Sequence, residues 1–97
     1  MVVLSKRVIR EFGERYPDAA EALRVWFAVV EAADWNSLPE LKTVYPTADY
    51  VGNDQYVFNI RGNRYRLIAR IHFDIRTVYI RFLGTHAGYD KIDARTI

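Results

Sequence analysis

Residues 56–73 read YVFNIRGNRYRLIARIHF, and their side chains follow the period of two that is typical of half-buried strands. Two strands are predicted in this run, one over residues 56–60 and a longer one over residues 64–73. The intervening Arg61-Gly62-Asn63 contains residue types that tolerate positive φ angles in tight turns. This part of the chain is therefore expected to form a β-hairpin.

The two faces of the longer strand differ in chemistry. One face is apolar and carries Tyr65, Leu67, Ala69, Ile71 and Phe73. The other is mainly basic and carries Arg64, Arg66, Ile68, Arg70 and His72. A third strand is predicted over Thr77–Leu83, with Tyr79 and Arg81 on the basic face. Its apolar face carries Val78, Ile80 and Phe82.

The residues that precede the hairpin predict a short strand and two amphipathic helices. Val2–Leu4 forms the strand, and Ser5 is the expected N-cap of a first helix with apolar residues at helical spacing. Pro17 opens a second helix that extends to Ala33. Its apolar stripe consists of Leu23, Trp26, Phe27 and Val30. We interpret this stripe as core packing rather than as a partner groove.

Two shorter helices complete the expected fold. Ser37 and Glu40 have the spacing of a capping box and begin a third helix that ends before Pro46. Residues Gly84–Asp93 are expected to form a turn and a short terminal helix. The predicted fold class is α+β, with helices packed on one face of a small antiparallel sheet and the basic face left open.

Length and composition limit the organisation of the chain. The 97 residues fit one compact domain, 1–97, and 51% hydrophobic residues suffice for an ordered core. There is no cysteine, which removes disulfides, thiol nucleophiles and cysteine-rich zinc sites and suits a reducing cytoplasm. The apolar start of the chain is too short for a signal peptide or a membrane span. We therefore expect a cytoplasmic protein without a membrane partner.

Positive charge is concentrated in the second half of the chain. Residues 1–50 carry six basic and eight acidic side chains, whereas residues 51–97 carry eight basic and four acidic ones. Seven of these eight later cations are arginines: Arg61, Arg64, Arg66, Arg70, Arg76, Arg81 and Arg95. The planar arginine fork grips phosphate with two parallel hydrogen bonds. The pattern favours a polyanionic partner, although arginines on exposed strands also serve solubility and protect sheet edges.

Common cofactor and catalytic motifs are missing from the sequence. The hairpin glycine joins two strands and lacks the further glycines of a nucleotide-binding loop. The two histidines, His72 and His86, show no metal-ligand spacing, so no metal and no cofactor are expected. No serine or threonine lies in a nucleophile-elbow context.

One polar cluster follows the last predicted strand, in Thr85-His86-Ala87-Gly88-Tyr89-Asp90. Histidine exchanges a proton near neutral pH, and tyrosine or aspartate can orient or transfer one. RNA supplies its own nucleophile in the 2′-OH, so a base, an acid and cations near the phosphate are enough for cleavage. The alternative is that His86 and Tyr89 simply cap or pack the terminal helix.

The hairpin and this cluster together resemble the signature of HigB-type toxins. The matching runs are 56–60, Gly62-Asn63, Arg66-Leu67-Ile68, Val78-Tyr79-Ile80-Arg81, Thr85-His86 and Tyr89-Asp90. Residues 41–46 with Ala48-Asp49 are similar to the segment that precedes this signature in the family. The resemblance implies a RelE/ParE-like fold and an mRNA interferase that cleaves translated messages on the ribosome. It also implies a helix-turn-helix antitoxin as partner, with DNA reached only through that antitoxin.

The resemblance also assigns expected roles to individual residues. Arg66 and Arg81 are similar to phosphate-binding and transition-state arginines of the family, and His86, Tyr89 and Asp90 to its C-terminal catalytic cluster. Lys42 is similar to an RNA-contacting cation of the family, and Asn63 matches its Gly-Asn turn. Together with Arg64 and Arg70 of the predicted basic face, they are the expected RNA-binding residues. Asn63 is equally explained by the hairpin turn. Tyr56, Phe58 and Tyr65 are candidates for base stacking or for the core.

Two other functions fit the same basic surface. ParE-like toxins of this fold poison DNA gyrase by binding and cut nothing, so the arginines would form a docking surface. A plain RNA-binding regulator would use the basic sheet without chemistry. The Thr85-His86 and Tyr89-Asp90 cluster favours the endoribonuclease.

Overall fold

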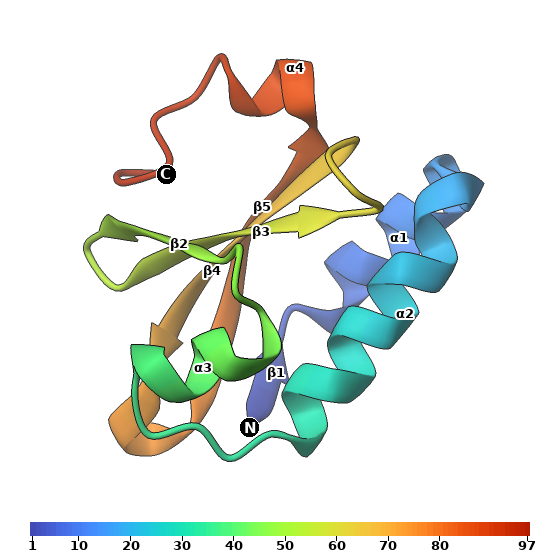
Figure 1. Cartoon of the computed structure of the whole chain (residues 1–97). Coiled ribbons are helices and arrows are strands. Elements are labelled where there is room, and N and C mark those ends of the chain that lie inside the picture. The colour runs from blue at the N-terminus through green and yellow to red at the C-terminus, as the bar shows by residue number, and fades with distance from the viewer.

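The computed structural model describes residues 1–97 and has an α+β fold, as predicted (Figure 1). The strands are β1 (Val2–Leu4), β2 (Asp49–Gly52), β3 (Gln55–Ile60), β4 (Tyr65–His72) and β5 (Thr77–Thr85). The helices are α1 (Lys6–Arg15), α2 (Pro17–Ala32), α3 (Leu38–Val44) and α4 (His86–Tyr89), with a 3₁₀ turn η1 (Phe73–Ile75). None of the helices combines the length and the apolar character needed to cross a membrane.

The sheet has the order β1-β5-β4-β3-β2. All neighbouring strands run antiparallel except β1, which pairs with β5 in parallel. The β3–β4 hairpin lies where the sequence predicts it, and its turn has positive φ angles at Arg61 and Gly62. This turn sets the register so that Asn59 lies directly opposite Arg66.

The main core lies between the helices and one face of the sheet (Figure 1). The β4 residues predicted for the apolar face are buried there; they are Tyr65, Leu67, Ala69 and Ile71. From α2, Leu23, Trp26 and Val30 pack against them, so these three residues of the stripe are core, as interpreted, while Phe27 is partly buried against the same core. The rings of Trp26 and Phe58 meet edge to face, with centroids 5.4 Å apart.

A β-bulge in β5 changes the predicted pattern of that strand. Ile68 pairs with Phe82, but the next β4 residue, Ala69, pairs with Ile80, so Arg81 is an extra residue in the ladder. An extra residue reverses the alternation beyond it. Phe82 therefore packs on the face opposite the helices, and its predicted place on the apolar helix side was wrong.

The second face of the sheet is covered in part, rather than open as predicted. The chain that follows α4 returns across it, on the side opposite α1 and α2 (Figure 1). A second small core forms there around Val57, Ile68 and Ala94, with Phe82, Tyr89, Ile92 and Ile97 packed against it. The buried Gln55 amide donates to the carbonyl oxygens of Ala94 (2.8 Å) and Ile97 (3.2 Å). The end of this face near α4 and the α3–β2 connection is hollowed.

Three local features differ from the sequence-based expectation. Strand β2 was not predicted, because its four residues are exposed or half-buried and are followed by Asn53 and Asp54 with positive φ angles. Ser5 does not cap α1 with its side chain; its φ of 72° places it in the left-handed region instead. At α3, the Glu40 carboxylate accepts a hydrogen bond from the Asn36 backbone N–H (3.2 Å), one residue earlier than the expected capping box.

Asp18 connects the first turn of α2 to the hairpin. Its carboxylate accepts hydrogen bonds from the Tyr65 hydroxyl (2.6 Å) and Arg64 (2.9 Å), and it forms an ion pair with Arg61 (3.0 Å). Arg64 precedes β4 and turns toward α2, so its predicted place beside Arg66 on the basic face was wrong.

These contacts predict a pH dependence of folding. The Tyr65 hydrogen bond, followed by the two arginines, holds the pKa of Asp18 below its ordinary value of 3.8. A carboxyl with a lowered pKa in the folded state stabilises the fold above its unfolded pKa and loses that contribution as pH falls through its folded pKa. We expect the melting temperature of wild type to fall more steeply below pH 4 than that of Asp18→Asn, measured by circular dichroism. Parallel acid profiles of the two proteins would contradict this linkage.

Candidate active site

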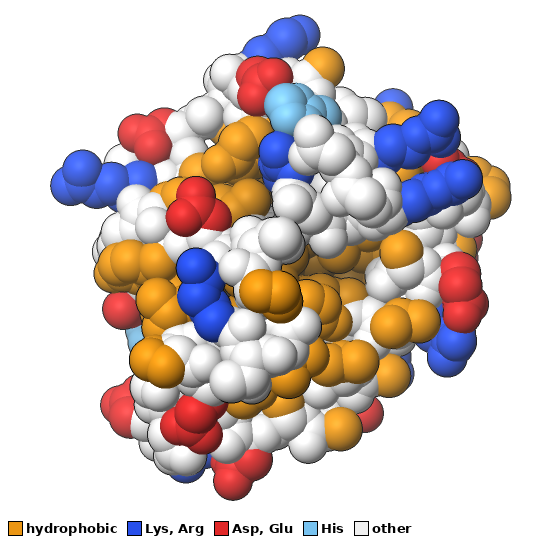
Figure 2. All heavy atoms as spheres, viewed as in Figure 1, with side chains coloured by type: hydrophobic (Ala, Val, Ile, Leu, Met, Phe, Trp, Pro, Cys, Tyr) orange, Lys and Arg blue, Asp and Glu red, His pale blue; other side chains and the backbone are white.

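A hollow of about 260 Å³ lies between the α3–β2 connection, the hairpin and α4. It is lined by Lys42, Pro46, Thr47, Ala48, Asp49, Val57, Asn59, Arg66 and Tyr89. The side of the molecule over α2, α3 and β2 shows apolar side chains at its centre and both charge signs around them (Figure 2). The surface is therefore not uniformly basic, and the hollow is where predicted site residues from distant parts of the chain meet.

Arg66 is the most tightly held side chain in this hollow. Its Nη1 donates to the amide oxygens of both Asn59, its neighbour across the hairpin, and Asn63, in the turn. The Tyr89 ring lies beside the guanidinium, with the ring centroid 5.5 Å from Cζ. The guanidinium is therefore fixed by groups from β3, the turn and α4.

The partners of Arg66 carry no charge, unlike those of many arginines in this protein. Five arginines pair with carboxylates: Arg7 with Glu11, Arg24 with Glu21, Arg61 and Arg64 with Asp18, and Arg76 with Asp34. No carboxylate forms an ion pair with Arg66. Its positive charge is held in place without being neutralised.

The hydrogen bonds of Arg66 leave a binding edge free. Both acceptors contact Nη1, and no protein group accepts from Nε or Nη2. These two nitrogens form one edge of the guanidinium, with parallel N–H groups that match two oxygens of a phosphate. Arg66 is thus arranged to bind an anion in a bidentate manner.

Lys42 and Asp49 add charges to the hollow from the opposite wall. Lys42 lies in the last turn of α3 and is exposed, and Asp49 begins β2 opposite Val57. A lysine ammonium adds an exposed positive charge, and the carboxylate is a proton acceptor. Nowhere in the structure do three His, Cys, Asp or Glu side chains gather closely enough to hold a metal ion.

Helix α4 is capped and anchored as well as placed beside the hollow. The Thr85 hydroxyl accepts from the Gly88 N–H (3.0 Å), and the His86 N–H donates to the Arg64 carbonyl (3.1 Å). Tyr89 packs on the second core and also lines the hollow. Its position is therefore compatible with both alternatives from the sequence, a structural role in α4 and a role in the site.

His86 and Asp90 form a pair at the edge of the site. The imidazole Nδ1 and the carboxylate Oδ2 are 3.2 Å apart, and both side chains are exposed. Neither residue lines the hollow, although both flank Tyr89 on the same short helical segment. The carboxylate can fix the orientation of the imidazole, with its other ring nitrogen left for solvent or substrate.

Gly84 makes room for this arrangement. It lies opposite Arg66 on β5, and a Cβ there would come within 2.6 Å of the Phe82 ring. The Phe82 ring in turn packs under α4 as part of the second core. A side chain at position 84 would therefore displace the support of Tyr89.

The structure does not bring Arg70 and Arg81 to the hollow. Arg81, at the bulge, has Nε and Nη2 each 3.4 Å from the Ile97 carbonyl oxygen. Arg70 lies opposite Gln55, the residue that holds the C-terminal segment, and its Nε is buried without a partner. Of the two arginines expected to act at the phosphate, the structure places Arg66 in the hollow and Arg81 outside its lining.

The sequence analysis did not name Asn59 or Asp49 as site residues, although both line the hollow. Asn59 is the one polar residue among five in the 56–60 strand, which is a usable signal. Tyr56, Phe58 and Tyr65 are at most 6% exposed, so they are core and not stacking platforms.

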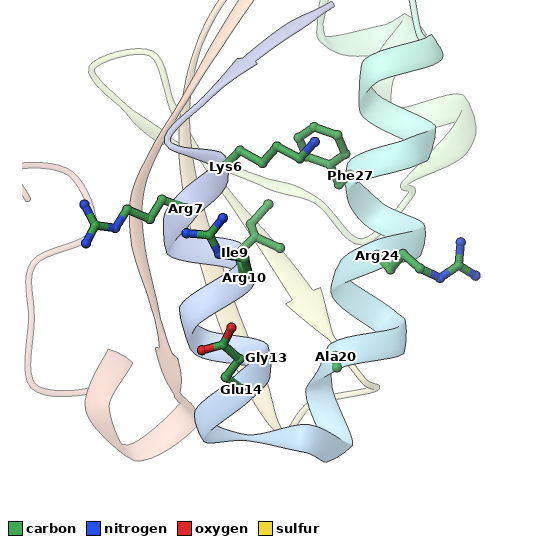
Figure 3. A pocket seen from close by; sticks show the side chains of 9 residues that line it. All are labelled: Lys6, Arg7, Ile9, Arg10, Gly13, Glu14, Ala20, Arg24 and Phe27. Atoms are coloured by element: carbon green, nitrogen blue, oxygen red, sulfur yellow. The ribbon is translucent and has the colours of Figure 1, made fainter.

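A larger hollow of about 510 Å³ lies elsewhere, between α1 and α2. Figure 3 shows Lys6 reaching over the Phe27 ring, while Arg7 and Arg24 point outward on either side. These two arginines are paired with Glu11 (2.7 Å) and Glu21 (2.5 Å). The groove also contains Lys6 and Arg10, which form no ion pair, so unpaired charge alone does not distinguish it from the hollow around Arg66; the hollow is distinguished by the predicted site residues Lys42, Arg66 and Tyr89 that meet there.

Comparison with known proteins identifies the family. Residues 19–92 match the model of HigB_toxin, described as the RelE-like toxic component of a toxin–antitoxin system. The chain belongs to the HigB toxin family.

Several curated relatives of this HigB-family chain match over nearly their whole length. It is 32% identical to the mRNA interferase HigB of Escherichia coli O6:H1 (strain CFT073), over 95% of this chain and 91% of the relative. It is 29% identical to the mRNA interferase toxin HigB of Escherichia coli K12, over 97% of this chain and 92% of the relative. The mRNA interferase HigB of Shigella flexneri shows the same identity and coverage.

Proposed function

We propose that this HigB-family toxin is an mRNA interferase, a ribosome-dependent endoribonuclease that cleaves translated messages. The observation that carries the proposal is Arg66, fixed by two neutral amides in a hollow that Lys42 and Tyr89 also line. Such a preorganised, uncompensated cation suits a phosphate whose charge increases during reaction. Relatives with the name mRNA interferase support the same reaction for this chain.

In the proposed reaction, the 2′-OH of the scissile nucleotide attacks its own phosphate. Its oxygen forms a bond to phosphorus, its proton passes to a base, and the bond from phosphorus to the 5′-oxygen breaks. The leaving 5′-oxygen takes up a proton. The products are a 2′,3′-cyclic phosphate and a 5′-OH end. Arg66 and Lys42 supply the positive charge at the phosphate, so the chemistry requires no metal ion.

Three groups are placed to move or orient protons. Tyr89 lines the hollow beside Arg66 and can donate to the leaving oxygen. The Asp49 carboxylate lines the same hollow and can accept a proton. His86, oriented by Asp90, is the third group and reaches the substrate from the rim.

The proposal also specifies the surroundings of the toxin. Translated mRNA places it in the cytoplasm, with the ribosome presenting the message to the hollow. The partner that silences it is a co-expressed helix-turn-helix antitoxin, which contacts DNA on behalf of the pair. The arginines away from the hollow, Arg70 and Arg81, lie on the same sheet face and add attraction for ribosomal RNA.

The proposal is tested in a purified translation system. We expect the wild-type protein to cut a message during its translation and to leave the same message largely intact without ribosomes, as mapped by primer extension. Inhibition of DNA gyrase without any cleavage would favour a ParE-like binding toxin instead. Binding of RNA without cleavage or growth arrest would indicate an RNA-binding regulator.

A further inference from the structure

Asn59 lines the hollow, and neither the sequence analysis nor the family resemblance assigns it a role. It lies on β3 directly opposite Arg66, and its amide oxygen accepts from Arg66 Nη1. Every other residue in the 56–60 strand is apolar, and the remaining four are at most 6% exposed. The Asn59 side chain thus lines the hollow and contacts the Arg66 guanidinium.

We propose that Asn59 is a positioning residue for the cleavage reaction: it orients Arg66 toward the scissile phosphate while leaving its charge uncompensated. The inference rests on the proposed function of the hollow. By occupying Nη1, Asn59 leaves the Nε and Nη2 edge of Arg66 for the phosphate. Asn63 contacts the same nitrogen from the turn, but Asn59 does so from a paired strand and fixes the geometry more rigidly.

The neutral charge of the amide matters because a carboxylate would hold Arg66 equally well. Aspartate has the same shape and keeps the acceptor oxygen, and it would add an ion pair. A carboxylate holds an arginine in this way at Arg76, which binds the Asp34 carboxylate (2.6 Å) as well as the Asn36 amide. At Arg66 both acceptors are amides, which keeps the guanidinium available to a phosphate.

A positioning role and a purely structural role predict opposite orders of effect. If Asn59 only braces the hairpin, Asn59→Asp is harmless because it keeps the acceptor, and Asn59→Ala is the worse variant. If Asn59 keeps Arg66 oriented and uncompensated, Asn59→Asp is the worse variant for activity, since it neutralises the phosphate site. Its folded state is expected to be as stable as wild type, or more so, through the new ion pair.

The experiment compares single-turnover cleavage of translated mRNA by wild type, Asn59→Asp and Asn59→Ala, with melting temperatures measured for each. We expect cleavage to fall by about 100-fold in Asn59→Asp and by about tenfold in Asn59→Ala. Asn36→Asp is the control for added charge, because it places a new carboxylate beside Arg76, which already has a carboxylate partner; it also removes the Asn36 amide hydrogen bond to Glu40 (3.3 Å), so its melting temperature is compared as well. The control should cleave at the wild-type rate.

A second readout separates this inference from the proposed function. Inorganic phosphate is titrated into each protein while the Nε–H signal of Arg66 is followed by nuclear magnetic resonance. The signal should shift in wild type and respond at least tenfold more weakly in Asn59→Asp, even if wild type cleaves no message. That last case would refute the endoribonuclease and keep only the role of Asn59 in orienting Arg66 toward a phosphate. Equal phosphate responses in the two proteins, or greater loss of cleavage in Asn59→Ala than in Asn59→Asp, would overturn the inference.

Discussion

Replacing Arg66 by alanine is expected to reduce single-turnover cleavage of translated mRNA by roughly 100-fold to 1000-fold, the usual cost of losing one preorganised donor to a developing oxyanion. The side chain is half-buried and its polar partners, Asn59 and Asn63, stand next to solvent. Water can therefore satisfy them after the substitution. We expect the Arg66→Ala variant to have the circular dichroism spectrum of the wild-type fold but to cleave mRNA much more slowly.

Two further variants make this expectation specific. Arg66→Lys keeps the charge but loses the planar fork, so it should recover binding to the ribosome more than cleavage. Arg81→Ala removes an equally basic side chain from the same sheet, but one that contacts the Ile97 carbonyl outside the hollow. This substitution should reduce single-turnover cleavage by less than tenfold. A loss in Arg81→Ala as large as that in Arg66→Ala would move the active site away from this hollow.

The hairpin was predictable because local chemistry dictates it. Positive-φ residues at the turn and alternating side chains at 64–73 require no knowledge of the rest of the chain. The register of Asn59 opposite Arg66 follows from the same turn, since Ile60 pairs with Tyr65. Asn59 could therefore have been found from sequence by pairing the two strands and asking which polar residue faces the arginine.

The bulge and the covered sheet face were not predictable from alternation alone. Alternation assumes an unbroken ladder, and the extra residue Arg81 reverses the faces beyond it. The second core depends on Ala94 and Ile97 reaching Gln55, about forty positions away in sequence. Such contacts depend on how elements pack and not on the periodicity of either segment.

The same limit applies to the candidate site. The resemblance named Lys42, Arg66 and Tyr89, and the structure brings these three to one hollow. The predicted basic face of the strand also included Arg64, but the carboxylate that pairs with Arg64 is Asp18 of α2, which hairpin periodicity cannot reveal. Whether an arginine is free for substrate is set by its tertiary partners, so charge patterns in a sequence overstate the size of a basic site.

The largest effect is expected from the substrate and not from the protein. A single 2′-deoxy or 2′-O-methyl nucleotide at the scissile position of a translated message removes the attacking hydroxyl or blocks it. If the 2′-oxygen is the nucleophile, no bond to phosphorus can form and cleavage at that position should vanish below detection. Binding should change little, because the contacts proposed for Arg66 and Lys42 are to phosphate oxygens that both substrates share.

The ends of the products provide an independent check on this chemistry. Attack by the 2′-oxygen leaves a 2′,3′-cyclic phosphate, or the phosphate from its later opening, and a 5′-OH that polynucleotide kinase can label directly. A modified nucleotide placed one codon away is the control for damage to translation, and it should leave cutting at the original position unchanged. Normal cleavage of the 2′-deoxy message, or a 5′-phosphate on the downstream product, would require water or another group as nucleophile. The hollow around Arg66 would then have to hold a second reactant, for which the 2′-OH mechanism leaves no role.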